Sequence, residues 1–124
     1  MEDDLGQLIE KVIGAAIEVH RHFGPGSIEA TYHRALEIEL GLRGISFESE
    51  VPVTLDYKGH PVGQGRIDLL VDRRLVVELK AVHRGADQFK RQVLAYLKAT
   101  DLTLGLVINF EVGVLKDGLA RVRL

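Results

Sequence analysis

The sequence predicts an α/β fold in which helices pack against a mixed β-sheet. Two stretches with helical character come first, a group of strand-length apolar runs follows, and a third helical stretch separates that group from a last short apolar run. A chain of 124 residues that is 46% hydrophobic can bury one core. We therefore expect one domain over residues 1–124.

Two helices are expected in the first third of the chain. From Leu5 to Phe23 apolar residues recur at the spacing of one buried helical face, and they are Leu5, Leu8, Ile9, Val12, Ile13, Ala16 and Ile17. Gly24-Pro25-Gly26-Ser27 interrupts this pattern. Ser27 is predicted to cap a second helix that runs to about Arg43 and ends at Gly44.

Three strands are expected next. Apolar residues fall largely on one parity from Phe47 to Tyr57, and the turn residues 58–61 follow, which indicates a half-buried strand and a hairpin. The apolar stretches 67–71 and 75–82 are separated by the short polar turn Asp72-Arg73-Arg74. Together these segments predict an antiparallel meander.

The last third of the chain predicts a helix and a central strand. Phe89, Val93 and Leu97 have helical spacing within a segment from Ala86 to about Ala99. Residues 104–108 form a short apolar run typical of a central strand, and residues 112–122 are expected to add edge structure. This order of elements is that of an α/β sandwich with a mixed sheet.

Composition excludes some classes of protein. The chain has no cysteine, which excludes disulfides and thiolate zinc sites and suits a reducing cytoplasm. The acidic start Met1-Glu2-Asp3-Asp4 and the lack of a long apolar run predict neither a signal peptide nor a membrane span, so we expect a cytoplasmic protein. A net charge of -2 gives no global attraction to a polyanion, which would have to meet a local patch.

Charged residues interrupt a strand that is otherwise apolar. Leu75, Val77 and Leu79 share one face of the segment 75–81, and Glu78 and Lys80 share the other. An ordinary alternative is a surface ion pair on a solvated edge strand. A site with chemistry needs a third group.

Asp68 supplies that group, because the short turn after residue 71 returns the chain so that Glu78 lies beside Asp68. Two adjacent carboxylates repel unless a proton or a cation lies between them, and oxygen ligands favour magnesium or manganese. The main-chain carbonyl of Leu79 is a further candidate ligand. Lys80 would orient or deprotonate a water and stabilise charge on a phosphate. The alternative for Asp68 is a surface aspartate near a turn.

Glu29 adds independent support from the second predicted helix. It falls in one stripe with Tyr32, Leu36 and Leu40, so we expect its carboxylate to point inward, where a metal or its water shell would satisfy it. The competing explanation is that the helix dipole favours acidic residues in a first turn.

The third predicted helix carries two polar residues beside its apolar face. Gln92 and Tyr96 stand one turn apart and are expected to frame the site, although Tyr96 also fits ordinary core with its hydroxyl at the rim. Arg84, Arg91 and Lys98 form a separate basic stripe, which is typical of a solvated face. None of the five histidines has a convincing metal-ligand spacing, although His33 and His83 lie near enough in sequence to approach the site.

At this point the motifs indicate a family. Gly26-x-x-Glu29-x-x-Tyr32 resembles the signature of the GxxExxY proteins, small members of the PD-(D/E)xK nuclease-like superfamily. The resemblance covers nearly the whole chain and includes Asp68, Glu78-Leu79-Lys80, Gln92-Val93-Leu94-Ala95-Tyr96 and Gly105-Leu106-Val107-Ile108-Asn109-Phe110. It implies a restriction-endonuclease-like three-layer sandwich with a central mixed β-sheet flanked by helices.

The resemblance also implies roles for individual residues. Glu29, Asp68 and Glu78 would form the acidic site, with Lys80 as the catalytic lysine; Gln92 and Tyr96 would be the Q-x-x-x-Y pair of the exonuclease-like branch, and Tyr32 would support the site. Three positions depart from the family pattern, and they are Ile67 in place of proline, Glu111 where glycine is common and Phe89 where relatives often have histidine.

These features predict a nuclease that hydrolyses phosphodiester bonds of nucleic acid, with DNA favoured, using Mg²⁺ or Mn²⁺ held by Asp68, Glu78, Leu79 and Glu29. One alternative is a catalytically silent nucleic-acid or protein interaction module on the same fold. Another is a phosphoesterase that acts on small substrates. Cutting both strands of a duplex would require a homodimer.

Overall fold

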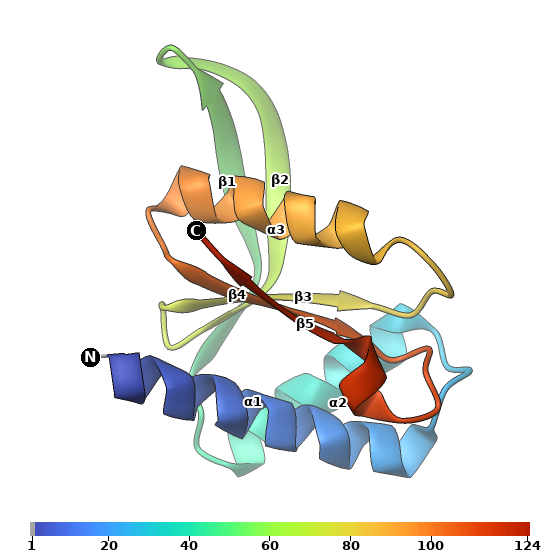
Figure 1. Ribbon diagram of the computed structural model, residues 1–124. Helices are drawn as coiled ribbons and strands as arrows, with labels where there is room; N and C mark the ends of the chain where they lie inside the picture. The colour runs from blue at the N-terminus through green and yellow to red at the C-terminus, as the bar shows by residue number, and fades with distance from the viewer. Residues whose placement is uncertain (1) are drawn as a thin grey trace.

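The computed structural model describes residues 2–124, with eight regular elements and one short 3-10 helix, η1 (Figure 1). The helices and strands are, in chain order, α1 (Glu2–Phe23), α2 (Glu29–Leu42), β1 (Phe47–Tyr57), β2 (His60–Val71), β3 (Leu75–Lys80), α3 (Ala86–Thr100), β4 (Leu104–Asn109), η1 (Leu115–Gly118) and β5 (Leu119–Arg123). None of the helices in this part of the chain is long and apolar enough to cross a bilayer.

The five strands form one mixed sheet in the order β1-β2-β3-β4-β5. Strands β1, β2 and β3 make the predicted antiparallel meander, and β5 is antiparallel to β4. Strands β3 and β4 are parallel, because α3 carries the chain back across the sheet between them. The central strand β3 therefore has a hydrogen-bonded neighbour on each side.

Helices cover both faces of the sheet, which gives the predicted three layers (Figure 1). Alternate residues of β3 and β4 point toward α1 and α2, where Leu75, Val77 and Leu106 belong to the larger apolar cluster. The opposite face packs against α3, where Val76 and Val107 belong to a second cluster. The alternation predicted for the segment 75–81 is confirmed, and it places Glu78 and Lys80 on the side of α3.

Two local predictions in the first third of the chain are wrong. Ile17 was expected to be buried, but it is 39% exposed, and Ala15 and Val19 are buried instead. Ser27 does not cap α2: the N-cap position is Ile28, which has no side-chain cap hydrogen bond. The main-chain N–H of Ser27 donates to the hydroxyl of Tyr32, so this serine belongs to the loop before the helix.

The β1–β2 hairpin is longer than its apolar pattern predicts. Its second strand begins at His60, directly after the turn Lys58-Gly59, in which both residues have positive φ as a tight hairpin turn requires. The tip of the hairpin projects beyond α3, and its base joins the sheet (Figure 1). Apolar patterning missed the first half of β2 because that half extends past the body of the protein and buries little.

Candidate active site

Glu78 is buried at the centre of the sheet. The residue is 2% exposed, and its strand lies between β2 and β4. The alternative of a surface ion pair on an edge strand is therefore wrong. A carboxylate in this position needs compensating partners, because removing a charge from water is expensive.

Asp68 lies next to Glu78 because β2 and β3 separate there. The ladder between these strands ends at the pair Leu69 and Val77, one step before Asp68 and Glu78. In place of a ladder bond, the main-chain N–H of Leu79 donates to Oδ2 of Asp68 at 2.8 Å. Asp68 is 8% exposed, so the alternative of a surface aspartate is wrong as well.

The neighbouring strand is also irregular at this level. Glu50 of β1 stands opposite Asp68 and has a φ of 55°, a left-handed conformation that side chains rarely adopt. Ile67 and Leu69 would share a face in a regular strand, yet they belong to the apolar clusters on opposite sides of the sheet. The backbone around Asp68 therefore departs from regular pleating where the acidic residues meet.

Glu78 has one satisfied and one unsatisfied oxygen. Its Oε2 lies 3.3 Å from Nζ of Lys80, whereas Oε1 is buried and receives no hydrogen bond from an N–H or hydroxyl group. Burial raises the pKa of Glu78 to about 7; Asp68 adds to the rise, by its charge and by a hydrogen bond that forms when one of the two carboxyl groups is protonated, and Lys80 opposes it. The unpaired oxygen beside a second carboxylate leaves a position that a cation would satisfy.

Lys80 is positioned by both its neighbours. Its ammonium contacts Glu78 and lies 4.7 Å from the centre of the Phe89 ring, within the range of a cation–π interaction. Phe89 in turn packs closely on Gly85, where an added Cβ would lie 2.9 Å from Cζ of the ring. Phe89 therefore holds the lysine in place.

Gln92 and Tyr96 are brought to the site by α3. The amide Nε2 of Gln92 donates to the hydroxyl of Tyr96 at 3.1 Å, and the main-chain N–H of Arg66 donates to the same oxygen at 3.4 Å. Tyr96 is 6% exposed and belongs to the apolar cluster under α3, with its hydroxyl at the pocket. Both expectations for Tyr96, core packing and a place at the site, are met by one side chain.

Glu29 lies on the rim of the site and not in the core. The residue is exposed, so the expectation that its carboxylate points into the core is wrong. Partial burial raises its pKa, an effect that the positive charge of Lys80 opposes and the negative charge of Asp68 supports. Glu29 therefore faces the same pocket from the first residue of α2.

These side chains line one open pocket of about 540 Å³. It is lined by Glu29, Pro52, Gln64, Gly65, Arg66, Asp68, Glu78, Lys80, Gln92 and Tyr96. Sequence reasoning missed the four residues from the base of the β1–β2 hairpin, namely Pro52, Gln64, Gly65 and Arg66. A signal was present, since glycine inside a strand often marks the close approach of another group. A Cβ on Gly65 would lie 2.7 Å from the hydroxyl oxygen of Tyr96.

Tyr32 does not line the pocket, but it supports the loop before α2, from which Glu29 reaches the pocket. Its ring is fully buried and stacks on Phe110 at 4.4 Å, and its hydroxyl donates to the carbonyl of Gly24. The main-chain N–H of Gly26 donates to Oε1 of Glu111 at 3.1 Å. Glu111 thus helps to fix the loop that precedes Glu29, the first residue of α2.

The residues fit a divalent cation that keeps part of its water shell. Within residues 2–124, no group of three or more His, Cys, Asp or Glu side chains is arranged as a metal cage. The donors that do converge are the carboxylates of Asp68 and Glu78, with the unpaired Oε1 of Glu78 among them. Magnesium is often bound by only one or two carboxylates together with water and substrate oxygens. Asp68 and Glu78 therefore suffice for such an ion.

The family of the chain follows from a comparison with known families. The family model described as the PD-(D/E)XK nuclease superfamily matches residues 6–122. The chain belongs to this superfamily. Its mixed five-stranded sheet with helices on both faces is consistent with the restriction-endonuclease-like α/β fold. No curated protein and no solved structure matches the chain.

Proposed function

We propose that this protein is a magnesium-dependent nuclease that hydrolyses phosphodiester bonds of DNA. The observation that carries the proposal is the buried carboxylate of Glu78, which has one unpaired oxygen and lies beside Asp68 and Lys80 in an open pocket. Buried polar atoms usually have a partner, and between two carboxylates that partner is a shared proton or a cation. Membership of a nuclease superfamily also supports the proposed nuclease activity.

Asp68 and Glu78 are the proposed ligands of Mg²⁺ or Mn²⁺, together with the main-chain carbonyl of Leu79. Glu29 faces them across the pocket and would act through bound water. A divalent cation bound here would polarise the phosphate and lower the pKa of a coordinated water. Asp68 is already oriented for this task, since the N–H of Leu79 fixes one of its oxygens.

Lys80 is the proposed catalytic lysine. Its ammonium would hold the attacking water and donate to a phosphate oxygen as negative charge develops there. Glu78 and Phe89 restrict the position of this ammonium before substrate binds. Such preorganisation reduces the rearrangement needed in the transition state.

Tyr96 is proposed to contact the substrate. Its hydroxyl oxygen accepts hydrogen bonds from Gln92 and from the main chain of Arg66, so both lone pairs are used. The remaining hydroxyl hydrogen is therefore available to a phosphate or base in the pocket. Gln92 would act through Tyr96 by holding this orientation.

A second candidate function is a catalytically silent interaction module on the same fold. The net charge of -2 favours it, because nucleases must still attract a polyanion. If the protein cuts both strands of a duplex, it would need to form a homodimer that presents two active sites. The lack of cysteine suits a protein of the reducing cytoplasm.

The deciding experiment is cleavage of labelled single-stranded, duplex and branched DNA, with matched RNA, in magnesium, manganese or EDTA. Wild-type protein is compared with Lys80→Ala and with Lys58→Ala, a control at the exposed tip of the hairpin. Metal-dependent cutting that is lost only in Lys80→Ala would support the nuclease. If no polymer is cut while calorimetry shows metal binding, the interaction module becomes the better explanation.

A further inference from the structure

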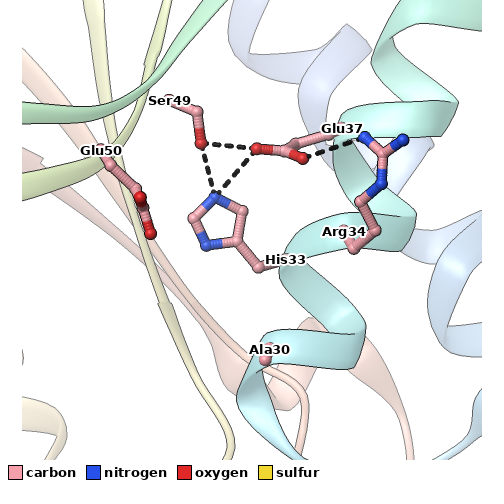
Figure 2. Close-up of a pocket in the computed structure, with 6 residues that line it drawn as sticks. All are labelled: Ala30, His33, Arg34, Glu37, Ser49 and Glu50. Atoms are coloured by element: carbon pink, nitrogen blue, oxygen red, sulfur yellow. Dashed lines mark hydrogen bonds and ion pairs between the residues drawn. The ribbon is translucent and has the colours of Figure 1, made fainter.

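A second pocket of about 390 Å³ lies between α2 and β1 (Figure 2). It is lined by Ala30, His33, Arg34, Glu37, Ser49 and Glu50. The side chains of His33 and Glu37 are only 16% and 17% exposed. This volume lies within the range of small-molecule sites, about 300–1,000 Å³. The pocket therefore has room for a ligand and polar groups to recognise it.

A chain of hydrogen bonds fixes the orientation of His33. Ser49 donates its hydroxyl hydrogen to Oε2 of Glu37 at 2.5 Å, and Nε2 of His33 lies 2.9 Å from the same hydroxyl oxygen. Although burial raises the pKa of Glu37, hydrogen bonds from Ser49 and Arg34 outweigh it and hold the pKa below its usual value, so this carboxylate is an acceptor. Nε2 must then carry a hydrogen and donate to Ser49.

The other ring nitrogen of His33 is consequently an acceptor in the neutral ring. Figure 2 shows Nδ1 turned away from Ser49 and Glu37. The hydrogen bonds of this ring among the described residues use Nε2. An oriented lone pair in a recess is suited to a ligand that offers an N–H or O–H group.

The second pocket adjoins the catalytic pocket, because neighbouring residues line the two. On α2, Glu29 lines the catalytic pocket and Ala30 lines the second one. Across the boundary, the guanidinium of Arg66 lies 3.7 Å from the carboxylate of Glu50. The hydroxyl of Ser49 also lies 3.5 Å from the main-chain oxygen of Asp68. The start of α2 and the residues around Asp68 therefore form a shared boundary between the pockets of Lys80 and His33.

We propose that the second pocket binds the nucleotide that adjoins the cleaved phosphodiester, with its base unpaired. This inference rests on the proposed nuclease function and names its substrate class, a single strand or a frayed end. Nδ1 of His33 accepts a hydrogen bond from the base. The ordered Ser49 and Glu37 keep His33 in place and reduce the entropy lost on binding.

Arg34 and Arg66, which lie at the two pockets, can bind the phosphate backbone of the same nucleotide. Arg34 is paired with Glu37 and Arg66 with Glu50, but the arginine side chains are 72% and 62% exposed. Exposed ion pairs contribute little, so Arg66 can exchange Glu50 for a phosphate at small cost, whereas Arg34 can offer a phosphate the N–H groups that its bond to Glu37 leaves unused. A base that remains stacked in a duplex cannot enter a recess of this kind, which is why the pocket selects an unpaired nucleotide.

The first test measures binding without turnover. The Lys80→Ala protein in EDTA is titrated with deoxyadenosine monophosphate while the ring resonances of its histidines are followed by NMR. The His33 resonance should shift with saturation, and that of the exposed His22 should not. Equal shifts of both, or no shift of His33, would overturn the subsite. This readout remains informative if the protein cuts no polymer, so failure of the nuclease and failure of the subsite are separable.

The second test uses cleavage of a single strand of known cut position. His33→Ala should raise KM about tenfold, the effect of one lost hydrogen bond, with kcat nearly unchanged. A strand that is abasic beside the cut should raise KM of the wild type by a similar factor and leave His33→Ala unaffected. A His22→Ala control should behave as wild type. Equal sensitivity of wild type and His33→Ala to the abasic site would refute the base contact.

Discussion

Two glutamates in neighbouring pockets, the buried Glu78 and the partly buried Glu37, have different surroundings in the fold. Glu78 in the catalytic pocket has an oxygen without a partner, and burial raises its pKa to about 7. Glu37 in the second pocket is also partly buried, but hydrogen bonds from Ser49 and Arg34 hold its pKa below the usual value. A carboxylate with complete partners organises its neighbours, whereas one that lacks a partner is prepared to receive a cation.

The largest effect is expected when the acidic pair itself is broken. Asp68→Asn keeps the shape of the side chain but removes a negative charge from the proposed ligands, so metal-dependent cleavage should fall by a factor of about 10²–10³. Glu37→Gln should change kcat by only a small factor. Single-turnover cleavage in magnesium, with circular dichroism as a check of folding, measures both. Comparable losses of cleavage rate in the two variants would contradict the proposal that only the catalytic pocket binds the metal.

Stability should respond to pH with opposite signs at the two glutamates. The pKa of Glu78 is about 7 in the fold against a usual value of 4.5, so its neutral form stabilises the protein below pH 4.5. That contribution is lost as pH rises through 7. Because glutamine carries no charge to bury, the stability of Glu78→Gln in EDTA relative to wild type should rise as pH increases from 4.5 to 8.

Glu37 provides the opposite case. Its pKa is lowered in the fold, so its stabilising contribution is present above the usual value of 4.5 and is lost as pH falls through the folded value. Glu37→Gln should be less stable than wild type at pH 7, and the difference should shrink at lower pH. Urea unfolding of the three proteins at several pH values checks both signs. Parallel pH curves would show that the two carboxylates are equivalent.

A glycine pair tests how tightly the catalytic pocket is built. Gly65→Ala would push a methyl group against the ring edge of Tyr96 and its hydroxyl, whereas an added Cβ on Gly63 of the same strand meets only Leu55 at 3.9 Å. Gly65→Ala should lower cleavage about tenfold by displacing Tyr96 and Gln92. Gly63→Ala should not. Adding Tyr96→Phe should make the Gly65→Ala effect smaller, since the displaced hydroxyl is then absent; additive losses would contradict the coupling.

The smallest effect is expected at the irregular residue between the two pockets. Glu50 has a φ of 55°, a conformation that glycine adopts without strain. Glu50→Gly should raise the free energy of unfolding by about 1 kcal/mol, measured in urea. The exposed ion pair to Arg66 that is lost with it contributes little. A decrease in stability would show that this backbone is not strained.

Much of the fold could be predicted because it follows from the periodic spacing of apolar residues along the chain. The spacing of apolar residues gave the positions of all three helices, and the bounds of β1 were predicted to the residue. Alternation within β3 separated Glu78 and Lys80 from the apolar face. These features depend on residues that are close in sequence, so they can be predicted without the structure.

Other features could not be predicted from the spacing of apolar residues. Ser27 looks like a helix cap, but α2 has Ile28 at its N-cap and no side-chain cap hydrogen bond. Glu29 shares a stripe with core residues, yet as the first residue of α2 it reaches solvent at the pocket rim. The base of the hairpin carries no chemical motif, and its residues line the pocket only because β2 bends past α3.

The sequence by itself determined the acid, acid and lysine set, the alternation that places Glu78 and Lys80 on one face, and the order of the elements. Only the tertiary structure decided that Asp68 and Glu78 meet where two strands separate, that one oxygen of Glu78 has no partner, and that His33 faces a second pocket. The physical reason is that periodicity records which side of an element is buried, whereas desolvation and hydrogen bonding depend on what the other elements bring to that side.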